Sequence, residues 1–311
     1  MAKAIFKSGE FSAILAYLCW GFLPIYWKAL SHVPAKIILA HRICWVTLSL
    51  AIILGIFGRF GDLKKIFLNR KLFLFACAGA LLISVNWLTY IWAVNQGRVI
   101  ETSLGYYLNP LLSVVLGVLL LGEKLRPLQF LSVLIAGLAL AYNIGALRQL
   151  PWVALVLALT FGFYGLLKKR AHLPNVATLF FETAVMSPLA FGYLLNQRKN
   201  LDFSASLPYL DFVDIQTSLL LVGTGIATAV PMLLFSRAAK KVGMIPLGFM
   251  QFIGPTVQLI CAVLIFKEEF GLTKQITFSL VGFSLLIYVF DLALAKNQRR
   301  KNRANPNIEA A

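Results

Sequence analysis

The chain has 311 residues, of which 59% are hydrophobic and 13% are charged, and its formal net charge is +17. A soluble globular protein carries about 25% charged residues, so this composition excludes an ordinary soluble domain and predicts an integral membrane protein. In a soluble protein the positive charge would suggest a nucleic-acid partner, but here the charges lie mainly between long apolar stretches.

Ten apolar stretches are long enough to cross the roughly 30 Å of hydrocarbon in a bilayer as helices. We therefore expect an all-α integral membrane protein with ten transmembrane helices. The first stretch follows Lys3 and Lys7, as the core of a signal peptide would, but its length and its lack of a small-residue cleavage site favour a retained helix. In chain order the stretches are approximately residues 11–30, 37–57, 73–95, 99–122, 128–146, 151–167, 177–195, 216–236, 243–266 and 273–295.

The basic residues between these stretches predict the orientation of the chain. If the N-terminus is cytoplasmic, twenty lysines and arginines lie on the inner side and eight on the outer side, with Arg42 left out of the count. Cytoplasmic loops carry the excess of Lys and Arg, so both termini are expected in the cytoplasm. We expect the basic tail to contact anionic lipid and not nucleic acid.

Two of the stretches share a proline and a following glutamate. Pro110 and Pro255 are 145 residues apart, and each is followed thirteen positions later by a glutamate, Glu123 or Glu268. A proline frees a backbone carbonyl and bends a membrane helix, so we interpret the pair as helix breaks in two copies of one element. The glutamates adjoin lysines and are expected to anchor helix ends.

The position of these breaks predicts a duplicated chain. Five stretches precede the loop near residue 147 and five follow it, and an odd number of helices per copy inserts the second copy upside down. The predicted units are a five-helix repeat at 1–146, an inverted five-helix repeat at 147–296 and a basic cytoplasmic tail at 297–311.

Ionisable residues inside the predicted helices need a reason, because a charge at membrane depth is energetically expensive. Arg42 and Glu182 fall in the second and seventh helices, which are equivalent in the two copies, so both could face one central cavity and Glu182 is a possible proton site. A buried ion pair, or snorkelling of Arg42 to the interface, would also account for them. Glu101 lies three residues after Arg98, where a solvated salt bridge is expected.

Aromatic and amide side chains in both halves are expected to line a substrate cavity. Asn86 and Tyr90 share one face of the third helix, and Gln251 and Gln258 share a face around Pro255. Such walls suit an amphipathic small molecule, although an interfacial aromatic belt would give a similar pattern. The cavity candidates are Arg42, Asn86, Trp87, Tyr90, Tyr106, Tyr107, Asn109, Glu182, Gln251 and Gln258.

Sequence signatures of catalysis are missing from the chain. It contains no Gly-x-Ser-x-Gly, no His-Glu-x-x-His and no phosphate-binding glycine loop, and its three histidines form no ligand set. Its four cysteines lie singly in apolar stretches, where packing is their expected role. We therefore expect no enzyme activity, no metal and no cofactor.

Four sequence segments together are specific enough to suggest a family. They are HRICW at 41–45, NWLTYIWAVN at 86–95, ETSLGYYLNPL at 101–111 with Gly122 and Glu123, and LGFMQFIGPT at 247–256. These segments closely resemble the RarD-type permeases, which belong to the EamA branch of the drug/metabolite transporter superfamily. The resemblance spans nearly the whole chain.

This resemblance implies a ten-helix permease of the bacterial inner membrane, with a central cavity between two five-helix repeats and alternating access. RarD proteins are commonly labelled chloramphenicol-resistance permeases, and relatives in the superfamily export amino acids, metabolites or drugs.

We therefore expect a secondary active transporter, an exporter of small organic solutes whose halves rock around a midplane site. Its expected partners are a small-molecule substrate, membrane lipid and, as a candidate coupling ion, the proton. The alternatives are an intramembrane enzyme acting on lipid, which would need a catalytic set that the sequence lacks, and a non-transporting scaffold or scramblase, which leaves the paired prolines unexplained.

Overall fold

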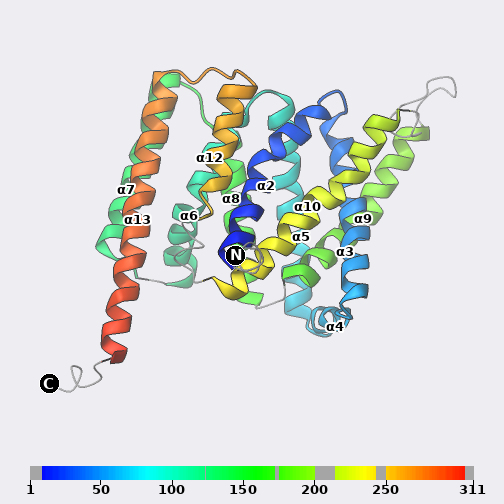
Figure 1. Cartoon of the computed structure of the whole chain (residues 1–311), viewed down its shortest axis with the longest axis horizontal. Coiled ribbons are helices and arrows are strands. Elements are labelled where there is room, and N and C mark those ends of the chain that lie inside the picture. Colours follow the sequence, from blue (N-terminus) through cyan, green and yellow to red (C-terminus); the bar gives the residue numbers. More distant parts are fainter. Residues whose placement is uncertain (1–8, 123, 172–174, 200–213, 243–249, 305–311) are drawn as a thin grey trace, which may run out of the picture.

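The computed structural model describes residues 9–122, 124–171, 175–199, 214–242 and 250–304. Every regular element in these ranges is a helix, which confirms the all-α prediction (Figure 1). Eight helices are long and apolar enough to span a membrane, and two shorter apolar helices occupy the sixth and ninth predicted positions. The elements are α2 (Gly9–Ala29), α3 (Ala35–Ile56), α4 (Gly61–Leu68), α5 (Arg70–Asn95), α6 (Val99–Leu121), α7 (Pro127–Leu147), α8 (Trp152–Ala171), α9 (Asn175–Lys199), α10 (Ile215–Lys241), α12 (Ile253–Ile260), the π-helix η1 (Cys261–Ile265) and α13 (Leu272–Ala304).

Polar caps and glycine turns set the ends of several helices. Asn69 and Asp214 accept hydrogen bonds from the first backbone N–H groups of α5 and α10. The hydrogen bond from the Thr217 side chain, together with the backbone donors, holds the pKa of Asp214 below its usual range. Gly122 ends α6 with a φ of 67°, a left-handed conformation that glycine adopts without steric cost.

The packing of the helices has the two-fold pattern that a duplicated chain requires. Numbering the ten spans in order, the fifth span after α2 is α8, after α3 it is α9, after α5 it is α10, after α6 it is α12 with η1, and after α7 it is α13. Three equivalent pairs pack on each other directly: α3 on α9, α6 on α12 and α7 on α13. The other main contacts come in exchanged pairs, with α2–α10 matching α5–α8, α2–α12 matching α6–α8, and α3–α10 matching α5–α9.

Small residues allow close approach at two of these contacts. A Cβ added to Gly105 of α6 would lie 2.8 Å from the carbonyl oxygen of Ala154 on α8. In the exchanged pair, a Cβ on Gly21 of α2 would lie 2.6 Å from the Cβ of Val257 on α12. Both interfaces therefore rely on a glycine for backbone contact, as membrane helices commonly do.

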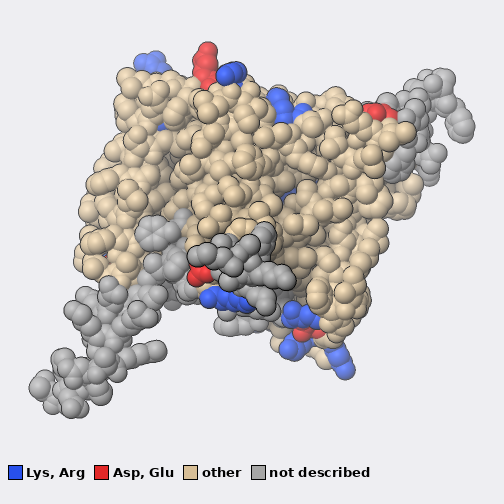
Figure 2. All heavy atoms as spheres, viewed as in Figure 1, with Lys and Arg blue, Asp and Glu red and all other residues tan. Residues whose placement is uncertain are grey.

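Consecutive spans run in opposite directions, as α2 and α3 do in Figure 1, and the inversion of the second half relative to the first stays a prediction. The turns between α2 and α3 and between η1 and α13 lie along the upper edge of Figure 1, whereas α4 lies at the lower edge. On the face in Figure 2, most charged side chains gather along these two edges, with a broad uncharged band between them. That band has the composition expected of a surface that faces lipid.

Two elements differ from the sequence prediction. The amphipathic segment before α5, predicted as a loop, forms the short helix α4, which buries Ile66. The last helix was predicted to end near residue 295 but continues to Ala304, so part of the predicted tail at 297–311 is helical. The lysines, arginines and glutamine of this segment are good helix formers. No proline interrupts the helix, because the first proline after Pro255 is Pro306.

The two predicted helix breaks also differ from each other. Pro110 lies inside α6, which continues without interruption from Val99 to Leu121. Pro255 lies in the first turn of α12, directly after a turn at residues 251–252. A proline in a first helical turn removes no hydrogen bond that the helix would otherwise make. Glu123 and residues 243–249, the first part of the ninth predicted stretch, lie outside the described residues.

Candidate functional site

Arg42 lies in a slot between two tryptophan side chains. It is on α3 and is only 4% exposed. Its Cζ atom lies 3.9 Å from the ring centroid of Trp87 on α5 and 4.8 Å from that of Trp27 on α2. Its Nε atom donates a hydrogen bond of 3.1 Å to Oγ1 of Thr228 on α10. Four helices from both halves of the chain therefore meet at this guanidinium.

Tyrosine side chains complete the surroundings of Arg42. The phenols of Tyr26, Tyr90 and Tyr106 lie within electrostatic range of the guanidinium. Tyr90 and Tyr106 pack edge to face, with ring centroids 5.7 Å apart. Three polar atoms here are buried without a hydrogen-bond partner among the residues that the structure describes: Nη1 of Arg42, the hydroxyl of Tyr90 and Nε1 of Trp27. We call this set, Arg42 with Trp27, Trp87, Tyr90, Tyr106 and Thr228, the arginine slot.

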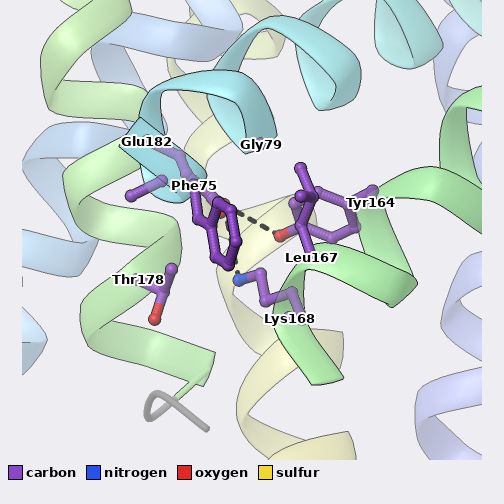
Figure 3. Close-up of a pocket in the computed structure, with 8 residues that line it drawn as sticks. Phe75, Gly79, Tyr164, Leu167, Lys168, Thr178 and Glu182 are labelled. Carbon is purple, nitrogen blue, oxygen red and sulfur yellow. Dashed lines mark hydrogen bonds and ion pairs between the residues drawn. The ribbon is translucent and has the colours of Figure 1, made fainter. Parts of the chain in front are cut away.

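A second polar cluster surrounds Glu182 on α9, which is 1% exposed. Oε2 of Glu182 lies 3.4 Å from Nζ of Lys168 and accepts a hydrogen bond of 2.8 Å from the hydroxyl of Tyr164. Figure 3 shows Lys168 and Tyr164 extending from α8 toward the carboxylate. Gly79 of α5 makes room for it, because a Cβ there would lie 2.7 Å from Oε1 of Glu182.

A small pocket opens beside this carboxylate. Apart from Glu182, Lys168, Tyr164 and Gly79, its lining is mainly apolar. The volume in which the centre of a water molecule can lie is about 10 Å³. That volume corresponds to about one water molecule. In this conformation the pocket therefore suits a proton or a water better than an organic solute. The remaining lining residues are Phe75, Ala76, Leu167 and Thr178.

Arg42 and Glu182 occupy related places in the two halves but have different partners. Each is the eighth residue of its helix, counted from Ala35 in α3 and from Asn175 in α9. The two helices pack on each other and start at opposite edges of the molecule (Figure 1). Among the described residues, Glu182 pairs with Lys168, and no carboxylate forms an ion pair with Arg42. The direct pairing that the sequence allowed is therefore absent.

The other cavity candidates are dispersed. Asn86 donates hydrogen bonds to the Leu157 carbonyl and to Thr160, and so joins α5 to α8. Tyr107 turns toward the α6–α12–α13 contact, where its ring stacks on Phe252. A further three candidates lie on α6, on α12 or just before it. Asn109 has a buried Oδ1 with no hydrogen-bond partner in the described part of the chain, Gln258 donates to the Trp20 carbonyl at 3.3 Å, and Gln251 lies in the turn before α12.

Two carboxylates at helix ends behave as predicted. Glu101 forms a partly exposed ion pair of 2.7 Å with Arg98. Glu268 accepts hydrogen bonds of 2.7 and 2.9 Å from the N–H groups of Val99 and Ile100, and so caps α6 from another part of the chain. Burial raises the pKa of Glu268, and these amide hydrogen bonds oppose that shift.

Sequence reasoning missed Trp27, Thr228, Tyr164 and Lys168. Trp27 precedes a lysine and has the signature of an interfacial residue, and Lys168 was counted among the loop charges. A sequence signal for Lys168 would have been a helix that continues beyond residue 167. The structure has this helix, because α8 extends to Ala171 and carries Lys168 inside the fold. A threonine or tyrosine in an apolar helix gives no comparable signal.

Comparison with known proteins identifies the family. The EamA-like transporter family matches residues 7–144 of the chain. An uncharacterised transporter of Pseudomonas aeruginosa is 40% identical over 94% of this chain and 96% of the relative, and Protein RarD of Escherichia coli is 35% identical over 95% and 98%. One solved crystal structure matches with a TM-score of 0.57 at 19% identity, covering 90% of this chain and 96% of the other, which supports a shared fold. The chain therefore belongs to the EamA-like transporter family, among the RarD proteins and their relatives.

Proposed function

We propose that this protein is a secondary active transporter that exports small organic solutes by alternating access between its two halves. The observation that carries the proposal is the arginine slot: a polar, aromatic site at membrane depth built from α2, α3, α5 and α6 of the first half and α10 of the second. Because helices of both halves form it, a relative movement of the halves would change its shape and its access.

The proposed arrangement in the cell follows the charge distribution. The lower edge of Figure 1 would face the cytoplasm and the upper edge the outside, in a bacterial inner membrane. The repeats would be residues 1–146 and 147–296, with both termini cytoplasmic. Paired elements in two inverted halves, with polar groups between them, are typical of secondary transporters.

Glu182 is the proposed proton site. Its carboxylate is buried, is held by Lys168 and Tyr164, and adjoins a pocket with room for about one water molecule. Protonation would neutralise the carboxylate and weaken its contact with Lys168, which would loosen α9 from α8. Titratable groups in the interior of a transporter commonly form such relays.

Solute exchange in proteoliposomes tests the proposal. Purified protein should mediate counterflow of solutes such as chloramphenicol, and an imposed pH gradient should change the flux. Glu182→Gln should retain counterflow but lose most of the response to the gradient, because an amide cannot exchange a proton at these pH values. Glu101→Gln is the matched control, since it removes a carboxylate from a partly exposed ion pair. Lipid flip-flop without solute exchange would favour a scramblase instead.

A further inference from the structure

Among the described residues, Arg42 and Arg98 each lie over a pair of tryptophan rings, and they differ in whether a carboxylate balances their charge. Arg98 lies 5.7 Å from the ring centroid of Trp92 and 5.2 Å from that of Trp152. Its charge is balanced by Glu101, which accepts two hydrogen bonds from it at 2.8 and 2.9 Å. The same aromatic arrangement at Arg42 has no carboxylate partner among the described residues.

The uncompensated charge is at the more expensive of the two places. The Arg98 side chain is 30% exposed near a helix end, whereas Arg42 is only 4% exposed. A buried cation at membrane depth is usually paired with an anion or with backbone carbonyls. Cation–π contacts stabilise the guanidinium, but tryptophan and tyrosine rings do not neutralise its charge.

The unpaired polar atoms indicate what the slot recognises. Nη1 of Arg42 and Nε1 of Trp27 can only donate hydrogen bonds, and the hydroxyl of Tyr90 can donate one. Donors from α2, α3 and α5 are thus available around one positive charge. An oxyanion that accepts from several of them would satisfy these atoms and the charge together, and a guanidinium matches a carboxylate in geometry.

We propose that the arginine slot binds the carboxylate of an organic acid, whose apolar body lies against the neighbouring aromatic rings. This inference deepens the proposed function and rests on it, because it names the chemical class of the transported solute. Neutral amides and amines of the same shape are poorer ligands, since an amide offers one weaker acceptor and an amine repels Arg42.

Access to the slot requires a change of conformation. Trp27 is fully buried, and Trp87 and Tyr90 are 8% and 3% exposed, so the rings close the slot from solvent. This conformation therefore corresponds to a closed form of the site. Alternating access supplies the opening, because Trp27 and Thr228 are on helices from different halves.

Binding to the full-length protein in detergent, measured by thermal shift, tests the inference. The probes are phenylacetate, indole-3-acetate and hexanoate, each against its amide, with phenethylamine as the cationic control. We expect the acids to bind about 10- to 150-fold more tightly than their amides, the range of a hydrogen bond to a charged group. Absence of a shift with all three acids, or equal binding of acids and amides, would overturn the inference without reference to any variant.

Three arginine variants locate the site. Arg42→Gln should abolish the preference for acids, and Arg42→Lys should retain part of it because the charge remains. Arg98→Gln, the matched arginine over two tryptophans, should bind the acids as the wild type does. Loss of acid binding in Arg98→Gln but not in Arg42→Gln would place the site elsewhere and refute the assignment.

Counterflow separates failure of this inference from failure of the proposed function. Exchange of neutral or cationic solutes without exchange of acids would leave the transport proposal intact and overturn the inference. Acid binding that depends on Arg42, without exchange of any solute, would support the slot and refute transport.

Discussion

Arg42 and Glu182 represent two ways of placing a charge inside a membrane protein. Arg42 is surrounded by aromatic rings and one threonine, whereas Glu182 is neutralised locally by Lys168. Both were recognisable in the sequence because ionisable residues are rare in apolar stretches. Their partners were not, because partners lie on helices that are distant in sequence and only tertiary packing brings them together.

The ion pair between Lys168 and Glu182 should be energetically coupled. Lys168→Met or Glu182→Gln alone leaves a buried polar group without its partner. The double variant should therefore lose less stability than the sum of the losses in the two single variants. We expect a coupling energy of about 0.5–3 kcal/mol in a double-mutant cycle, measured by denaturation in detergent.

The pair Arg98 and Glu101 provides the control for this cycle. Its side chains are 30% and 24% exposed, and such pairs contribute about 0.2–1 kcal/mol. A second cycle between Arg42 and Glu182 should be additive within about 0.5 kcal/mol, because these residues share no partner. Strong coupling in that cycle would restore the sequence-based hypothesis that the two charges act together.

At the scale of the helix, glycine contacts fix the spacing between α6 and α8. Gly105→Ala would bring a methyl group 2.8 Å from a backbone carbonyl oxygen of Ala154, which cannot move independently of its helix. We expect a loss of about 1–3 kcal/mol in stability, as for other overpacked contacts.

Gly137→Ala is the matched control for that substitution. Gly137 lies on α7, where an added Cβ meets no atom within 4 Å, so this change should be neutral or slightly stabilising. The measurement is the melting temperature of the purified protein in one detergent. Equal melting temperatures for the two variants would show that the α6–α8 spacing adjusts freely.

Pro110 affects the arginine slot through the backbone. A proline has no N–H, so the carbonyl of Tyr106, four residues earlier in α6, lacks its usual helical donor. Pro110→Ala should restore that hydrogen bond, leave expression largely intact and reduce solute flux, because it straightens the helix that carries Tyr106. Pro188→Ala on α9 is the control, since this proline is also inside a helix but is exposed on the surface. Wild-type flux in both variants would show that neither proline shapes the site.

The elements themselves were largely predictable, and their irregularities were not. Long apolar stretches identify membrane helices by composition alone, so every predicted span coincides with a helix in the parts of the chain that the structure describes. The uninterrupted course of α6 through Pro110 depends on packing that a proline pattern does not reveal. The π-helix η1 likewise has no sequence signature that we recognised.

At the scale of the whole molecule, the exchange of helix contacts between halves supports the duplication inferred from Pro110 and Pro255. The 145-residue shift suggested equivalent helices, and the structure packs α3 on α9 and α7 on α13 as that symmetry requires. Weak similarity was sufficient for topology because helix order constrains packing. It was insufficient for the site, because Arg42 and Glu182 acquired different neighbours in the two halves.

Orientation in the membrane is predicted from the basic residues at the two edges of the molecule. The lower edge of the molecule carries α4 (Figure 1), and its flanking basic residues contribute to the predicted inner excess of twenty to eight. Single cysteines in an otherwise cysteine-free protein report the side of each edge. Leu68→Cys in α4 should react with an impermeant maleimide only after cells are permeabilised, whereas Ser31→Cys and Gly271→Cys should react in intact cells.

These three positions suit the experiment because all are exposed at element ends and none removes a lysine or arginine. The charge bias that sets the orientation is therefore unchanged. The native cysteines, which are buried or half-buried, can be replaced by alanine without changing that bias. Labelling of Leu68→Cys in intact cells, with protection of the other two, would reverse the topology and place Glu182 toward the outside.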